Sequence, residues 1–253
     1  MTGMMLNPWW FAIGGGSPPP PAGIEYVGGR THTFNGTTGN TSISLSGTLT
    51  GGLASSPAAN DFVIVTYATE SSGDIDLTMV TAGYTEVTDL WGNDSIDVNL
   101  AVYTKHMGAT PDADVVVGPT TNAGYPGAVT IHVWRGVDLT TPMDVAATTA
   151  TGGNSGHPNP PAITPTTLGA VIVVCAAAGS LNAGVTLSQS GSELSNFRAA
   201  YSDNGDATNN DVTAAMGSKA WSGSGAFDPV ALVGNASASL AWAALTLALR
   251  PAA

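Results

Sequence analysis

Short runs of alternating apolar and polar residues recur along this chain from Ile24 to its end. Clusters of Gly, Asn, Asp or Pro separate them, and typical runs are SISLSGTL, DFVIVTYAT, SIDVNLAVYTK, GAVTIHVWR and AVIVVCAAA. Period-two patterning with β-branched residues predicts strands, and the clusters predict turns between them. The last run, ASLAWAALTLALR, is rich in helix-forming Ala and Leu, but Leu245, Leu247 and Leu249 alternate as in a strand. We therefore expect an all-β fold that includes a strand at this end.

The composition supports a folded, β-rich chain with a nearly neutral surface. Charged residues make up 9% of the 253 residues, against about 25% in ordinary soluble domains. Hydrophobic residues make up 43%, which is enough for a core and argues against disorder. This length suits one large all-β domain or two small ones.

An internal repeat is the clearest sign of organisation. NDFVIVTYATESSGD resembles LGAVIVVCAAAGSLN, VNLAVYTKHMG resembles VTAAMGSKAWSG, and AVTIHVWRG resembles AALTLALRP. These pairs keep their order and align Asp61 with Gly169, Lys105 with Lys219, and Arg135 with Arg250. In the third pair, Val129, Ile131 and Val133 fall opposite Ala, Thr and Ala, so the faces agree poorly. A slip of one residue would exchange the faces.

Two related halves, residues 24–151 and 166–253, are joined by residues 152–165, GGNSGHPNPPAITP. They predict either two small sandwiches or one sandwich built from both halves. Interleaved strands would make the second case a jelly-roll-like fold. We favour one compact, jelly-roll-like β-sandwich over residues 24–253, because each half alone offers few large hydrophobic residues.

The N-terminal segment is apolar and aromatic, and a linker separates it from the rest. Residues 1–13 contain Trp9, Trp10 and Phe11, and residues 14–23, GGGSPPPPAG, combine flexible Gly with a stiff polyproline stretch. Each aromatic side chain can bury about 150–250 Å², so three could contribute roughly 10 kcal/mol before ordering costs. The alternative is a disordered terminus or an expression remnant. We interpret the segment as a docking anchor formed by Leu6, Asn7, Pro8, Trp9, Trp10 and Phe11.

The charge balance excludes several classes of partner. The net charge is −12 with only six Lys and Arg residues, whereas nucleic-acid binding needs clustered positive charge. Anionic membrane surfaces are disfavoured for the same reason. No apolar run approaches the roughly 20 residues of a membrane span. The N-terminus also lacks the basic residue that opens a signal peptide, so we expect the segment to be retained.

No motif for catalysis, a cofactor or a metal is evident. The four histidines, His32, His106, His132 and His157, lie outside nucleophile and metal-spacing motifs. His132 and Trp134 share one face of a predicted strand, which we interpret as ordinary surface or interface. No glycine loop has the pattern that holds a phosphate. We therefore expect no enzyme activity and no cofactor.

Two further features have a structural explanation. The stretch DNGDATNND, from Asp203 to Asp211, packs oxygen ligands suited to calcium, but it lacks the terminal bidentate glutamate of an EF-hand. A polar turn explains it as well, and we expect no metal there. Cys175 in AVIVVCAAAG is the one cysteine, and we expect a small core residue.

The chain also resembles a known family. LNPWWFAIGGG resembles the short N-terminal LNP–aromatic–F segments of virion proteins from tailed phages of alphaproteobacteria. The progression DFVIV, LAVYTK, AVTIHVWRGVD and PMDV in residues 61–145 resembles a β-sandwich module of phage tail-fibre and other surface proteins. GAVIVV and the closing ALRP resemble the end of that module, although AGYTEV lacks its usual tryptophan.

The resemblance implies a non-enzymatic virion protein, assembled in the host cytoplasm, with an anchor peptide, a linker and a displayed sandwich. The anchor would dock on other virion proteins, at a tail hub or tip or on the capsid, and such proteins commonly form trimers. A hydroxyl-rich sandwich with exposed aromatics also suits a host-surface glycan. Trp91 and Tyr125, in loop-like contexts, are candidate ligand contacts, with local packing as the alternative.

A tail-fibre or tail-tip protein is therefore our leading interpretation. The alternatives are a head-decoration or head-fibre protein, a secreted carbohydrate-binding module or adhesin, and a hydrolase fused to an anchor.

Overall fold

The computed structural model describes residues 23–35, 39–93, 97–119, 125–153, 156–180, 186–203, 211–234 and 241–253, which form fourteen strands and no helix. The anchor and nearly all of the linker lie outside these ranges. In the described part, no helix is long and apolar enough to cross a membrane.

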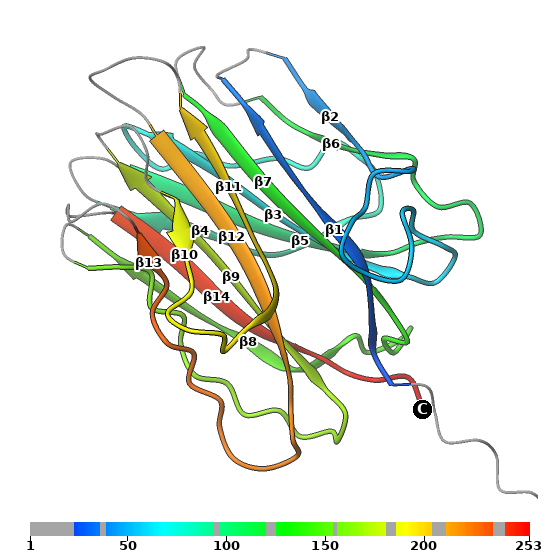
Figure 1. Cartoon of the computed structure of the whole chain (residues 1–253). Helices are drawn as coiled ribbons and strands as arrows, with labels where there is room; N and C mark the ends of the chain where they lie inside the picture. Colours follow the sequence, from blue (N-terminus) through cyan, green and yellow to red (C-terminus); the bar gives the residue numbers. More distant parts are fainter. Residues whose placement is uncertain are drawn as a thin grey trace, which may run out of the picture.

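Two five-stranded antiparallel sheets make up most of the structure (Figure 1). The first has the order β1 (Glu25–Phe34), β7 (Gly127–Arg135), β3 (Phe62–Ser71), β5 (Asp97–His106) and β4 (Thr85–Gly92). The second has the order β11 (Ser195–Asp203), β12 (Asp211–Ala220), β9 (Val171–Ser180), β14 (Ala241–Leu249) and β8 (Met143–Gly152). Two short ribbons pair β2 (Thr41–Ser44) with β6 (Asp114–Val117), and β10 (Leu187–Ser188) with β13 (Val233–Gly234).

The sheets pack face to face over one shared core. Ile64 and Leu100 of the first sheet belong to the same buried cluster as Val173, Met216 and Leu245 of the second. Cys175 is also buried in this cluster, as expected. The prediction of an all-β sandwich is confirmed, and so is the strand over the last alternating run, which is β14.

The internal repeat corresponds to a structural duplication. Read from β8, the second sheet runs β8–β14–β9–β12–β11, which matches β1–β7–β3–β5–β4 strand for strand. Val63 pairs with Lys105 across β3 and β5, and Ile172 pairs with Lys219 across β9 and β12. Each related set of strands therefore forms its own sheet, and the strands are not interleaved between sheets as in a jelly roll. The second set begins with β8, so part of residues 24–151 belongs to the second sheet and the two sets divide before residue 143. These registers match Asp61 with Ala170, one residue beyond the alignment of the sequences.

The third pair of repeats does agree in its faces, although the side chains differ in size. Val129 and Ile131 of β7 point to the outer side of the first sheet, where β2 and β6 cover them. Ala244 and Ala248 of β14 belong to clusters on the outer side of the second sheet. The large residues of β14, such as Leu247, instead face the shared core. Both strands alternate in the same phase. The valine and isoleucine side chains of β7 lie on the outer face of its sheet, whereas the leucine side chains of β14 lie on the core face.

The matched arginines bind different buried carboxylates. Arg135 Nε and Nη2 donate to Asp61 at 2.9 and 3.0 Å, and Arg250 Nε donates to Asp144 at 3.3 Å. The Asp61 and Asp144 side chains are 1% and 0% exposed. Each arginine thus pairs with a buried aspartate at the same end of its sheet.

Both ends of the sandwich lie at one pole, which we call the basal pole (Figure 1). There β1 begins at Glu25, opposite Arg135 in β7, and β14 ends at Leu249, opposite Val171 in β9. Ala252 N donates to Gly136 O and fixes the C-terminal residues there. The strands β1, β3, β4, β8, β9 and β11 all end at the opposite pole, which we call the apical pole.

Candidate functional site

The two predicted ligand contacts are only partly accessible. Trp91 is half-buried in β4, opposite Asn99, so it lies in a strand rather than a loop. Tyr125 is half-buried against the outer cluster of the first sheet, and its hydroxyl lies 2.9 Å from Ser72 Oγ. Neither side chain lines the hollow described below. The anchor residues Leu6 to Phe11 lie outside the described residues.

His132 is the one histidine whose interpretation the structure corrects. It is fully buried on the core side of β7, with its ring 5.0 Å from Tyr26 and 6.0 Å from Trp134, so this face is not surface. Burial is the main cause that lowers its pKa to about 3, and the charge of Arg198 adds to the shift. His132 is therefore neutral at ordinary pH. The sequence pattern missed this because the second sheet covers a face that alternation alone cannot distinguish from an exposed one.

The other polar motifs form no recognisable centre. His157 Nδ1 accepts a hydrogen bond from Gly234 N at 3.2 Å. Among the described residues, no group of three or more His, Cys, Asp or Glu side chains is placed to hold a metal ion. Residues 204–210, between Asp203 and Asp211, lie outside the described ranges.

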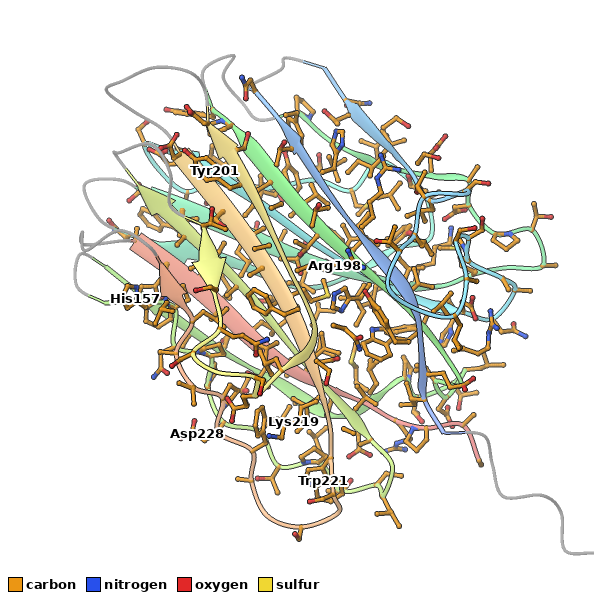
Figure 2. All side chains as sticks on the ribbon, in the orientation of Figure 1. His157, Arg198, Tyr201, Lys219, Trp221 and Asp228 are labelled. Atoms are coloured by element: carbon orange, nitrogen blue, oxygen red, sulfur yellow. The ribbon has the colours of Figure 1, made fainter. Side chains whose placement is uncertain are left out.

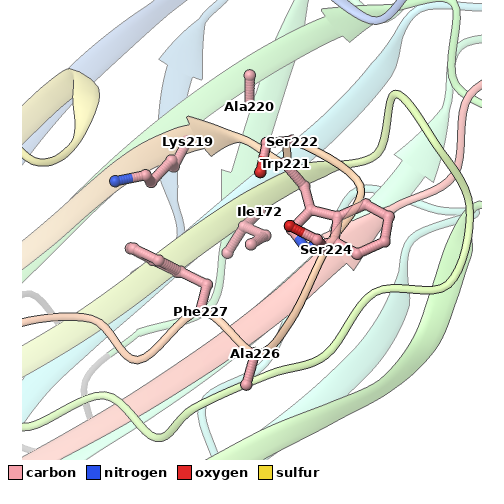
Figure 3. A pocket seen from close by; sticks show the side chains of 8 residues that line it. All are labelled: Ile172, Lys219, Ala220, Trp221, Ser222, Ser224, Ala226 and Phe227. Atoms are coloured by element: carbon pink, nitrogen blue, oxygen red, sulfur yellow. The ribbon is translucent and has the colours of Figure 1, made fainter.

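The candidate site is a hollow of about 150 Å³ on the outer face of the second sheet, near the basal end of β12 (Figures 2 and 3). We call it the Lys219 hollow. Figure 3 shows Lys219 and Phe227 on one side, Trp221 on the other and Ile172 between them. Its lining consists of Ile172, Lys219, Ala220, Trp221, Ser222, Ser224, Ala226 and Phe227.

Local sequence explains how the hollow forms. After β12 ends, Gly223 and Gly225 adopt φ values of +92° and +71°, which favour glycine and let the chain turn tightly. The turn carries Phe227 back over Ile172 of β9, and Phe227 forms two backbone hydrogen bonds of 2.9 Å with Ile163, in the segment between β8 and β9. Trp221 Nε1 donates to Gly225 O at 3.1 Å and so fixes the indole beside the turn.

Lys219 is weakly paired at the rim of the hollow. Its Nζ lies 4.8 Å from the centre of the Phe227 ring and 4.0 Å from Glu193 Oε1, and its side chain is 41% exposed. Glu193 Oε2 meanwhile accepts a hydrogen bond from Val230 N at 2.9 Å. The lysine therefore has a cation–π contact and a distant carboxylate, but no close anionic partner.

At the duplicated position in the first sheet, which we call the closed copy, the lysine already has a close carboxylate partner. There Lys105 Nζ lies 2.7 Å from Asp112 Oδ2 and 2.8 Å from Ala82 O, over the ring of Tyr84. Met107 occupies the place of Trp221 and is 2% exposed. The same backbone position thus carries a closely paired lysine in one sheet and a weakly paired one in the other. Lys105 also lines a separate hollow of about 350 Å³, together with Glu86, His106 and Met143.

Each of the other Lys and Arg side chains donates at least one hydrogen bond of 3.3 Å or less. Their acceptors are Ser44 O for Arg30, Asp112 for Lys105, Asp61 for Arg135, Tyr26 for Arg198 and Asp144 for Arg250. In the part of the chain that the structure describes, Lys219 makes no side-chain hydrogen bond. The sequence aligned Lys219 with Lys105, but it held no signal that one lysine is paired and the other is not.

The Lys219 hollow has an apolar lining with a few polar groups. Its lining holds no histidine, cysteine or carboxylate, and it combines an apolar floor, two aromatic walls, two serine hydroxyls and one ammonium group. Such a set of apolar surface with a few polar groups is typical of a small-ligand site. No family model, curated protein or solved structure matches this chain.

Proposed function

We propose that this chain is a structural, non-enzymatic protein of a tailed-phage virion, of the tail-fibre or tail-tip type. Residues Leu6 to Phe11 dock on a neighbouring virion protein, and the sandwich is displayed for contact with the host surface. The resemblance of LNPWWF and of the sandwich segments to phage virion proteins supports this proposal. The protein assembles in the host cytoplasm, as a homotrimer on the tail hub or tip.

The polarity of the sandwich is the observation that carries the proposal. The chain enters the sandwich at Glu25 and leaves it beyond Leu249, and both residues lie at the basal pole. A module attached through its N-terminus is therefore held at one end, and its apical pole and lateral faces remain available. A polyproline stretch extends by about 3.1 Å per residue, so the linker in residues 14–23 keeps the sandwich clear of its support.

The Lys219 hollow supplies a surface for the displayed contact. It lies on a lateral face, near the basal end of β12. The linker gives this face room to approach a second surface. Avidity from several copies on one particle would strengthen a weak single contact.

The second candidate function is head decoration. The same anchor would then dock on the capsid, and the same polarity would project the sandwich from the head. Immunogold electron microscopy of phage particles, with antibodies against residues 24–253, tests both. We expect label at the tail tip. Label confined to the capsid would favour decoration, and unlabelled, chain-free particles would contradict a virion protein.

A further inference from the structure

We infer that the Lys219 hollow binds an acidic saccharide, whose carboxylate pairs with Lys219 and whose ring packs on Trp221. This inference deepens the proposed function, since it rests on the displayed sandwich contacting a host surface. It names the class of ligand that the contact takes. The argument has three independent parts: the charge at the rim, the shape of the walls and the closed copy of the site.

The charge at the rim favours an anion. The chain has a net charge of −12, so its overall field repels anionic ligands and only a local cation can hold one. Lys219 has that position, because its side chain is 41% exposed and its ammonium group makes no hydrogen bond among the described residues. Glu193 Oε1, at 4.0 Å, is the group with which a ligand carboxylate competes.

The walls suit a sugar ring. The Trp221 indole is half-buried and held by its hydrogen bond to Gly225, so it offers a fixed aromatic face. Phe227 completes an apolar surface for the C–H face of a ring, above the fully buried Ile172, and Ser222 and Ser224 are exposed beside it for its hydroxyls.

The closed copy shows which group pairs with this lysine. In the first sheet the position of Lys219 is held by Lys105, whose partner at 2.7 Å is the Asp112 carboxylate. Met107, at the position equivalent to Trp221, is buried. The first copy thus supplies its own carboxylate and its own buried apolar side chain. A ligand that supplies both to the second copy is a carboxylate attached to a ring with an apolar face, which describes a uronic acid.

The probe is an oligosaccharide of galacturonic acid, and its methyl ester is the matched neutral control. We expect titration calorimetry of the full chain to detect binding of the acid. The ester should bind with an affinity at least about tenfold lower, because it cannot form the charge-assisted hydrogen bond. Lys219→Gln should lower the affinity for the acid by about the same factor and leave the affinity for the ester unchanged. Lys105→Gln, the equivalent change in the closed copy, should alter neither.

Two further variants separate a direct role from a structural one. Glu193→Gln keeps an acceptor for Val230 N but removes the competing charge, so acid binding should strengthen. Trp221→Ala should lower the affinity for the acid and for the ester by similar factors. Circular dichroism of each variant checks that the sandwich is folded.

The inference is overturned if acid and ester bind equally, or if Lys219→Gln binds the acid as the native chain does. It also fails if the native chain binds neither sugar. The immunogold result is independent of all three outcomes. If the sugar does not bind but the tail tip is labelled, the acidic-saccharide ligand is contradicted and the virion role is kept. If the sugar binds but the particles are unlabelled, the virion role is contradicted and the ligand is kept.

Discussion

Replacing Asp144 by alanine is expected to lower the free energy of unfolding by about 3–5 kcal/mol. The Asp144 side chain is fully buried at the start of β8. It accepts hydrogen bonds from the backbone N–H groups of Thr166 and Thr167 and from Arg250 Nε. The substitution leaves these donors without their acceptor. Urea unfolding followed by tryptophan fluorescence measures the change.

Asp112 provides the matched control, because it is also an aspartate paired with a basic residue but its side chain is 22% exposed. Asp112→Ala should cost no more than about 1 kcal/mol, as for a pair near the surface. Equal costs for the two variants would contradict a structural role for burial at Asp144.

The stability from Asp144 also has a defined pH dependence. Burial alone would raise the pKa of Asp144, but the hydrogen bonds from Thr167 and Thr166 outweigh it and lower the pKa below its ordinary value of 3.8. The folded state therefore favours the ionised carboxylate. Its contribution is present above pH 4 and is lost as the pH falls through the lowered pKa, and Asp144→Ala should remove this part of the acid sensitivity.

Replacing Glu70 by glutamine is expected to stabilise the protein at alkaline pH. Glu70 is 3% exposed near the apical end of β3, where Gly179 of β9 leaves room for it: a Cβ at Gly179 would lie 3.4 Å from Glu70 Cγ. Burial, together with the charges of Asp211 and Asp97, raises the pKa of Glu70 to about 9. The folded protein therefore holds a neutral carboxylic acid at this position at neutral pH.

The sign of the effect follows from the two pKa values. An unfolded Glu70 loses its proton near pH 4.5, whereas the folded one keeps it to about pH 9. Between these values folding takes up a proton, so stability falls as the pH rises, by at most about 1.4 kcal/mol per pH unit. Glu70→Gln should remove this slope, and its advantage over the native chain should grow from pH 5 to 9. The exposed Asp114→Asn variant should keep the native slope, and a native profile that is flat over this range would refute the account of Glu70.

Much of the fold is predictable because each local pattern has one physical solution. The alternation of Leu245, Leu247 and Leu249 specifies a strand even though their neighbours favour helix. The repeated lysine and arginine positions identify the duplication, since Lys105 and Lys219 occupy equivalent registers. What local pattern cannot specify is which face of a strand a second layer covers. For that reason the pattern around His132 predicts surface or interface, whereas the structure places its side chain in the core.

The candidate site was much less predictable. Met107 and Trp221 occupy equivalent positions, and their sequences do not show that one is buried and the other lines a hollow. The pairing of the two lysines depends on residues outside the similar stretches, namely Asp112 beside Lys105 and Glu193 beside Lys219. Trp91 and Tyr125 stay predictions as ligand contacts, and their half-buried positions limit the area they can offer.

Docking of the N-terminal anchor is the central claim, and a pull-down tests it most directly. Phage particles that lack the chain are incubated with the intact protein, with a deletion of residues 1–16, and with a control in which residues 14–23 become a Gly/Ser linker of equal length. We expect the intact and linker-control proteins to bind the particles and the deletion to lose binding, because it removes Trp9, Trp10 and Phe11. Equal binding by the deletion would contradict the anchor and place the virion contact on the sandwich.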